Sequence, residues 1–283
     1  MSSPPPRTER TAADPAARYL DLMKRCLTRA AFPETVSTYV PDTPRGRRIL
    51  ALAQRWLGRR DLGIYLRAGS DPATRQDGSD WPATAETMIG LERLDNVQHC
   101  VEAALEDDVP GDLLEAGVWR GGASILMRGV LAAHGDPDRV VWAADSFAGL
   151  PPPDPGHAAD AEDLHHTQPF LAVGLDEVRA NFARYGLLDD RVRFLEGWFR
   201  DTLPAAPIQA LAVLRADGDM YGSTMDILTA LYAKVSPGGF VIIDDYGAIP
   251  ACKLAVDEFR EARGITEPLE PIDWTGVFWR RAG

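Results

Sequence analysis

Five short apolar segments constrain the fold of this chain more than any other feature. They cover residues 112–116, 140–144, 192–195, 210–216 and 240–243, and all but the third are followed by a stretch with helical periodicity. Apolar runs of this length, without polar alternation, are typical of strands buried on both faces. Strands that alternate with helices predict an α/β fold, doubly wound around a mainly parallel sheet.

The chain before this core has a different composition. Residues 1–14 are rich in Pro, Ser, Thr and Ala, and we expect a disordered tail. Residues 15–83 contain two amphipathic helical patterns, at 15–31 and 45–57, and then a segment at 63–81 rich in Gly, Ser, Asp and Pro. We therefore predict an N-terminal helical extension, or cap, over 15–83.

The core domain is predicted to span residues 84–283. It begins with a long amphipathic pattern that predicts a helix at about 84–105. An insertion at about 147–173 follows the second predicted strand and shows little periodicity. Because long loops inside compact domains are commonly lids or binding loops, we expect this insertion to cover the functional site.

Composition argues against several classes of function. The chain carries 42 acidic and 30 basic residues, a formal net charge of −12, and phosphate binding needs clustered cations. No apolar run approaches the roughly 18 residues of a membrane span, and the start lacks the apolar stretch of a signal peptide. We expect a cytoplasmic protein that binds neither nucleic acid nor membrane.

Four aspartates follow two of the predicted strands. Asp217 and Asp219 come directly after 210–216, and Asp244 and Asp245 come directly after 240–243. If these parallel strands are neighbours, about 4.8 Å apart, their ends bring three carboxylates together at the carboxyl edge of the sheet. All-oxygen ligands favour a hard cation, so the pattern predicts a metal site for Mg²⁺, with Ca²⁺ or Mn²⁺ as alternatives.

A glycine-rich turn follows the first predicted strand. Glu115 precedes Gly117, and two further glycines follow at 121 and 122, a spacing that fits neither GxGxxG nor a phosphate-binding P-loop. Asp145 ends the second strand, where an acid can accept hydrogen bonds from both hydroxyls of a ribose. An acid before such a turn and a second acid after the next strand favour S-adenosylmethionine as the ligand.

Several motifs together resemble the macrocin/mycinamicin O-methyltransferase family, the TylF/MycF type. They are Glu115-Ala-Gly-Val-Trp-Arg-Gly-Gly, Asp145-Ser-Phe-Ala-Gly-Leu-Pro, Glu196-Gly-Trp-Phe, Asp217-Gly-Asp-Met-Tyr-Gly-Ser-Thr and Ile242-Ile-Asp-Asp-Tyr-Gly. The resemblance implies a class I S-adenosylmethionine-dependent methyltransferase, Rossmann-like in fold. It also implies Mg²⁺-dependent methylation of a sugar hydroxyl on a bacterial secondary metabolite, such as a glycosylated antibiotic.

The resemblance also assigns site residues by position. The implied cofactor pocket contains Met88, Glu115, Gly117, Asp145, Ser146, Gly197 and Trp198. The implied ligands of Mg²⁺ are Asp217, Asp244 and Asp245. Asp219, two residues from Asp217, is our first candidate for the general base that takes the proton of the acceptor, and His157, His165 and His166 in the insertion are its competitors.

Other functions remain open at this point. A catechol-type O-methyltransferase would share the fold and the metal but would act on an aromatic vicinal diol. An NAD-dependent dehydrogenase has a similar sheet, although the GxGxxG motif is missing, and a non-catalytic binding module would keep the same motifs. The apolar faces of the N-terminal helices need a partner surface, so we also expect a homo-oligomer.

Overall fold

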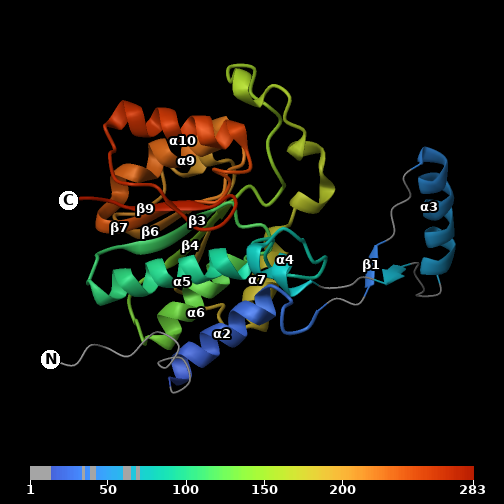
Figure 1. Cartoon of the computed structure of the whole chain (residues 1–283), viewed down its shortest axis with the longest axis horizontal. Coiled ribbons are helices and arrows are strands. Elements are labelled where there is room, and N and C mark those ends of the chain that lie inside the picture. The colour runs from blue at the N-terminus through green and yellow to red at the C-terminus, as the bar shows by residue number, and fades with distance from the viewer. Residues whose placement is uncertain (1–13, 34–35, 39–42, 60–64, 68–70) are drawn as a thin grey trace.

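The computed structural model describes residues 14–283 except 34–35, 39–42, 60–64 and 68–70 (Figure 1). The predicted disordered tail at 1–14 therefore lies, apart from Asp14, outside the described residues. Within the described part, no helix combines the length and the apolar content that a membrane span requires.

A seven-stranded sheet forms the centre of the molecule. Its strands are β3 (Asp112–Ala116), β4 (Val141–Asp145), β5 (Val192–Glu196), β6 (Leu211–Ala216), β7 (Val235–Ile243), β8 (Glu270–Pro271) and β9 (Val277–Arg280). The order across the sheet is β5-β4-β3-β6-β7-β9-β8. Neighbours from β5 to β7 are parallel, whereas β9 is antiparallel to both β7 and β8. The predicted mainly parallel α/β sheet is thus confirmed.

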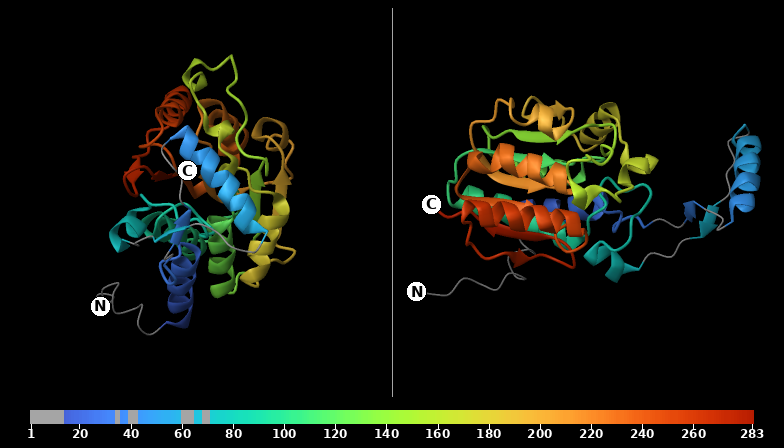
Figure 2. Two further views of the ribbon diagram at one scale, coloured as in Figure 1. Left: turned by 90° about the vertical axis from the view of Figure 1, so that its right-hand side faces the viewer. Right: turned by 90° about the horizontal axis from the view of Figure 1, so that it is seen from above.

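Helices cover both faces of this sheet (Figures 1 and 2). One face carries α5 (Leu91–Glu106), α6 (Gly122–Ala133) and α7 (Leu175–Arg184), and the other carries α8 (Phe199–Thr202), α9 (Tyr221–Leu231) and α10 (Pro250–Arg263). Successive strand residues alternate between the two layers, since Leu113 joins the first apolar core and Leu114 the second. The central strands β3 and β6 are buried on both faces, which explains why their sequences are largely apolar.

The predicted N-terminal helical extension is only partly helical. Its first helix, α2 (Pro15–Leu27), packs Leu20, Met23 and Leu27 into the first core beside α6. Gly129 permits this close contact, because a Cβ on Gly129 would lie 2.6 Å from the sulfur of Met23.

Three described elements of the extension form an arm (Figure 1). In this arm β1 (Val36–Thr38) pairs with β2 (Tyr65–Arg67) in an antiparallel ladder. Helix α3 (Pro44–Gly58) comes between the two strands in the sequence. Figures 1 and 2 show α3 standing away from the body of the molecule. The segment predicted as a loop at 63–81 instead contains β2 and the short helix α4 (Pro72–Asp77).

The predicted helix at 84–105 begins seven residues later than expected. Gly90 caps α5 in an extended conformation, at φ −79° and ψ 179°. The preceding residues form hydrogen bonds to other segments: Glu86 N–H donates to the carbonyl of Leu27, and Gly122 N–H donates to the carbonyl of Glu86. These tertiary bonds replace the first turns of the helix, so Met88 lies in an irregular connection rather than on a helix.

The insertion at about 147–173 folds over the carboxyl edge of the sheet. It contains three short 3-10 helices, η1 (Ala158–Asp160), η2 (His165–Thr167) and η3 (Pro169–Leu171). Hydrogen bonds from two of its parts help to attach it to the core. Asp160 accepts hydrogen bonds from Tyr221 N–H and Gly222 N–H at the start of α9, and the indole N–H of Trp119 donates to the carbonyl of Phe170 at 2.8 Å.

Candidate active site

Three of the predicted carboxylates converge at the ends of β6 and β7. The parallel register sets Ala216 beside Ile243, so the residues that follow these two positions are neighbours. One carboxylate oxygen from each of Asp217, Asp244 and Asp245 lies within 4.8 Å of the others. The structure thus brings together the three residues predicted as metal ligands, at the edge where open α/β sheets bind ligands.

Two buried arginines contact this cluster, and the sequence did not reveal them. Arg215 is 1 % exposed and donates to Glu115 at 2.6 Å, to Asp217 at 2.9 Å and to Asp244. Arg93 on α5 donates to the second oxygen of Asp244. A signal for Arg215 existed, because it is the one charged residue in the apolar run 211–216.

The acidic residues of the cluster nevertheless outnumber these two arginines. Burial and this excess negative charge raise the pKa values of some of the acids. Burial raises the pKa of Asp217, and Asp244 raises it further. Burial and the neighbouring Asp219 raise the pKa of Asp245 well above its usual value. Burial alone would also raise the pKa of Asp244, but Arg215 and Arg93 outweigh it and hold that pKa below normal. Excess buried negative charge with all-oxygen donors fits a hard divalent cation.

Asp219 lies beside this trio but not within it. It adopts a left-handed conformation, at φ +54°, and its N–H donates to Asp245 at 3.4 Å. Burial, and then Asp217, raise the pKa of Asp219 to about 7. Of the competing histidines, His165 lines the same region and contacts Asp163 at 2.6 Å, whereas the ring of His157 packs on Tyr221.

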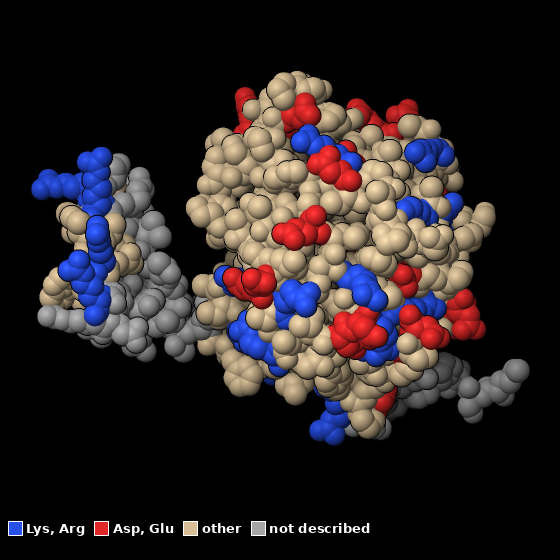
Figure 3. All heavy atoms as spheres, turned by 180° about the vertical axis from the view of Figure 1, so that it is seen from behind, with Lys and Arg blue, Asp and Glu red and all other residues tan. Residues whose placement is uncertain are grey.

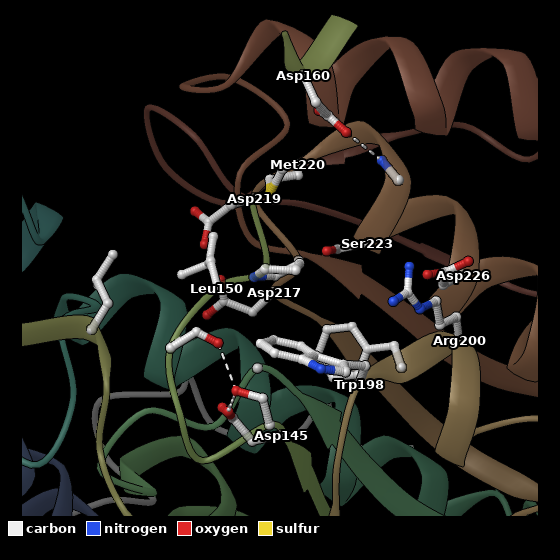
Figure 4. Close-up of a pocket in the computed structure, with 18 of the residues that line it drawn as sticks. Asp145, Leu150, Asp160, Trp198, Arg200, Asp217, Asp219, Met220, Ser223 and Asp226 are labelled. Atoms are coloured by element: carbon white, nitrogen blue, oxygen red, sulfur yellow. Dashed lines mark hydrogen bonds between the residues drawn. The ribbon is translucent and has the colours of Figure 1, made fainter. Parts of the chain in front are cut away.

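A cavity of about 170 Å³ opens beside the glycine turn (Figure 4). Six of the seven residues predicted for the cofactor line it, namely Met88, Gly117, Asp145, Ser146, Gly197 and Trp198. Asp217 and Asp219 also line it, so the cavity reaches the acidic cluster.

The glycine turn owes its shape to Gly117 and Asp145. Gly117 has φ +91°, and a Cβ there would lie 1.9 Å from the carbonyl oxygen of Asp217, so only glycine fits. The carboxylate of Asp145 accepts hydrogen bonds from the N–H groups of Val118 at 2.7 Å and Phe147 at 2.8 Å. Asp145 therefore fixes two loops of the cavity, while its predicted contact with a ribose stays a prediction.

Glu115 lies apart from this cavity. Its carboxylate is 2 % exposed and is bound by Arg215 and by the hydroxyl of Ser124 on α6. Burial raises the pKa of Glu115 to about 7. The structure gives Glu115 a place within the buried charge network, and its predicted role in holding the cofactor remains untested.

A second cavity, of about 290 Å³, adjoins the first. The two share Met88, Gly117, Trp119, Leu171, Asp217 and Asp219 in their walls. The second also contains Asp244 and Asp245, and its outer wall includes Trp81, Phe170 and Trp274. Two ligands bound in the two cavities would therefore meet beside the acidic cluster, as a donor and an acceptor must in a group transfer.

Comparison with known proteins places this geometry in context. Residues 16–281 match the model of the family described as macrocin-O-methyltransferase (TylF). The chain is 54% identical over 265 residues to 8-demethyl-8-(2,3-dimethoxy-alpha-L-rhamnosyl)-tetracenomycin-C 4'-O-methyltransferase of Streptomyces olivaceus, covering 93% of this chain and 92% of that protein. It is 49% identical to mycinamicin III 3''-O-methyltransferase of Micromonospora griseorubida, covering 93% and 96%.

A solved structure agrees with the sequence relatives. The O-methyltransferase NovP superposes with a TM-score of 0.82 at 47% identity, covering 95% of this chain and all of that one. Demethyldecarbamoylnovobiocin O-methyltransferase of Streptomyces niveus is 58% identical, covering 78% of this chain and 92% of that protein.

Proposed function

Because the chain belongs to the macrocin-O-methyltransferase family, we propose that it methylates a sugar hydroxyl of a glycosylated bacterial secondary metabolite, such as an antibiotic. The fold is that of class I S-adenosylmethionine-dependent methyltransferases, and the chain is an O-methyltransferase. The location that we propose for the active site rests on one observation. Two cavities share Asp217 in their walls; one is lined by the predicted cofactor residues, and the other by the predicted metal ligands.

In this proposal Asp217, Asp244 and Asp245 hold Mg²⁺. When bound, the ion supplies Lewis-acid stabilisation to an oxygen that is losing its proton, and S-adenosylmethionine supplies the methyl group. Arg215 and Arg93 keep Asp244 ionised and oriented. The walls of the two cavities restrict the angle between acceptor and cofactor, and such orientation lowers the barrier by several kcal/mol, up to about 7–11.

Asp219 is the residue that we assign to proton removal. It lines both cavities and stands outside the three ligands, so a carboxylate oxygen of Asp219 is available to take the proton of the acceptor hydroxyl. His165 lines the second cavity and is the competing base, whereas His157 lines only the first and His166 neither.

An acceptor assay tests the proposal. Purified protein is incubated with S-adenosylmethionine, Mg²⁺ and a panel of glycosides, with a catechol as the control for the catechol-type alternative. We expect methylation of a glycoside, loss of turnover in EDTA and recovery with Mg²⁺. Asp217→Asn and Asp219→Asn should each lower kcat on the order of 100-fold, with little change in the affinity for S-adenosylhomocysteine.

The matched control is Asp176→Asn, an exposed carboxylate in the first turn of α7, which should keep full activity. Equal activity in EDTA and in Mg²⁺ would remove the metal from the proposal. Full turnover by Asp219→Asn would transfer the base assignment to His165. Methylation of the catechol and of no glycoside would replace the sugar with an aromatic acceptor.

Two further parts of the proposal concern the whole protein. The family match favours methyl transfer over the NAD-dependent dehydrogenase and the non-catalytic binding module that the sequence left open. We also propose a homo-oligomer, because α3 exposes Ile49 and Leu52 on an arm outside the body of the molecule. The cytoplasmic location stays a prediction.

A further inference from the structure

Two exposed tryptophans stand at the second cavity. Trp81 is 65 % exposed and Trp274 is 51 % exposed, and both line this cavity together with Phe170, which is 49 % exposed. They come from three separate segments: the connection before α5, the turn between β8 and β9, and the insertion. Large apolar side chains gathered around one opening commonly mark a binding surface.

The backbone that carries Trp274 is fixed to the metal-ligand segment. The hydroxyl of Thr275 donates to the carbonyl of Asp244 at 3.0 Å, and Gly247 N–H donates to the carbonyl of Thr275 at 2.8 Å. The indole N–H of Trp274 donates to the carbonyl of Asp77 at 2.9 Å. The ring is thus held in one orientation while half of its surface remains open to solvent.

Trp81 is held through the residue before it. Asp80 pairs with the buried Arg75 at 3.2 Å, and Arg75 in turn donates to the carbonyl of Ile89 at 3.2 Å. Pro82 follows directly and restricts the backbone on the other side. A tryptophan on a fixed backbone loses little conformational entropy when a ligand packs on it, which favours binding.

The charge of the cavity selects among acceptors. Its lining contains five acids, Glu115, Asp217, Asp219, Asp244 and Asp245. Among the described residues of this lining, the arginines are Arg93 and Arg215, and both are engaged by carboxylates; His165 is paired with Asp163. In the proposed site the acceptor sugar occupies the ion, so the diphosphate of a nucleotide-activated sugar would find no unpaired basic side chain in the described lining. A neutral glycoside with an apolar aglycone suits both the charge and the aromatic wall.

We propose that Trp81 and Trp274 form an aromatic rim that binds the aglycone of the acceptor, an apolar ring system attached to the sugar that is methylated. This inference rests on the proposed function and deepens it, because it assigns acceptor selection to two named residues. The sugar enters the acidic part of the cavity, and the aglycone packs against the indole rings at the opening.

Calorimetry on the full chain, loaded with S-adenosylhomocysteine and Mg²⁺, tests the rim with two probes. They are 2-naphthyl α-L-rhamnoside and methyl α-L-rhamnoside, which share a sugar and differ in aglycone. We expect the naphthyl glycoside to bind at least about tenfold more tightly. Trp81→Ala and Trp274→Ala should each weaken its binding about fivefold or more, and should change the binding of the methyl glycoside less than about twofold.

Leu254→Ala, which removes an exposed apolar side chain on α10 outside both cavities, should leave both affinities unchanged. Three outcomes would contradict the proposed aromatic rim. They are equal affinity for the two glycosides, no binding of either, and equal weakening of both by the tryptophan variants. A methylation assay on the same probes separates the two proposals. Tighter binding of the naphthyl glycoside without methylation of any acceptor would contradict the proposed function but support the aromatic rim. Methylation with equal affinity for the two glycosides would support the proposed function but contradict the aromatic rim.

Discussion

Arg215 links three of the acidic residues on which the site depends. It is fully buried in β6 and binds Glu115, Asp217 and Asp244 through one guanidinium group. Replacing it with methionine leaves these carboxylates buried without their main counter-charge. We expect Arg215→Met to lower the free energy of unfolding by about 3–5 kcal/mol at pH 7, because an uncompensated buried charge is costly.

Urea unfolding followed by circular dichroism measures this loss. The control is Arg200→Met, whose guanidinium is 60 % exposed and pairs at 3.8 Å with the equally exposed Asp201. We expect that control to change the free energy of unfolding by no more than about 0.5 kcal/mol. A loss below about 1 kcal/mol for Arg215→Met would show that the acids reorganise without the arginine.

Individual site residues differed in how far the sequence predicted them. Asp217, Asp244 and Asp245 could be predicted, because strand ends in a parallel sheet are local features that place side chains at a common edge. Arg93 could not, since it is 151 positions from Asp244 and sits in an unremarkable amphipathic helix. Partners so distant in sequence become visible only when the helix is placed against the sheet.

At the scale of elements, the side chain of Asp160 attaches the insertion to the start of α9 by hydrogen bonds. The N-cap residue of α9, Met220, offers no side-chain acceptor, and Asp160 of η1 supplies both oxygens to the first N–H groups of this helix. We expect Asp160→Ala to destabilise the protein by about 1–2 kcal/mol, as loss of a helix cap does. Amide hydrogen exchange should rise in 147–173 and in the first turn of α9.

Asp71→Ala provides the comparison. Asp71 caps α4 by accepting a hydrogen bond from Ala73 N–H at 3.0 Å, so its loss removes a cap of the same kind elsewhere. Exchange in 147–173 should not change in Asp71→Ala. If exchange in the insertion stays slow in Asp160→Ala as well, other contacts such as that of Trp119 with Phe170 hold the insertion alone.

Elements of the core were predicted more accurately than those before it. Strands β3 and β6 match their predicted ranges within a residue, because burial on both faces leaves a continuous apolar signal. The pattern at 84–105 predicted too early a start for α5, since the hydrogen bonds of Glu86 with Leu27 and with Gly122 outweigh helical periodicity. The pairing of β1 with β2 was missed because each strand has only three residues.

At the scale of the whole molecule, the charge on the arm differs from that of the chain. Helix α3 contains four arginines and no acidic residue, although the formal net charge of the protein is −12. Figure 3 shows the basic side chains along this helix, apart from the body. Ile49 and Leu52, three positions apart, are 59 % and 69 % exposed. A basic helix with an apolar face suits a second, acidic copy of the same chain.

Sedimentation velocity tests this arrangement. We expect the wild-type protein to sediment as a dimer or larger assembly, and the double variant Ile49→Glu, Leu52→Glu to sediment near the 30.9 kDa of one chain, because two carboxylates cannot be buried in an apolar contact. Leu254→Glu, an equally drastic change at an exposed position of α10, should leave the assembly intact.

Since α3 lies outside both cores, the double variant should also unfold at the wild-type temperature once association is allowed for. A wild-type protein that already sediments as one chain would mean that the arm serves another purpose than self-association.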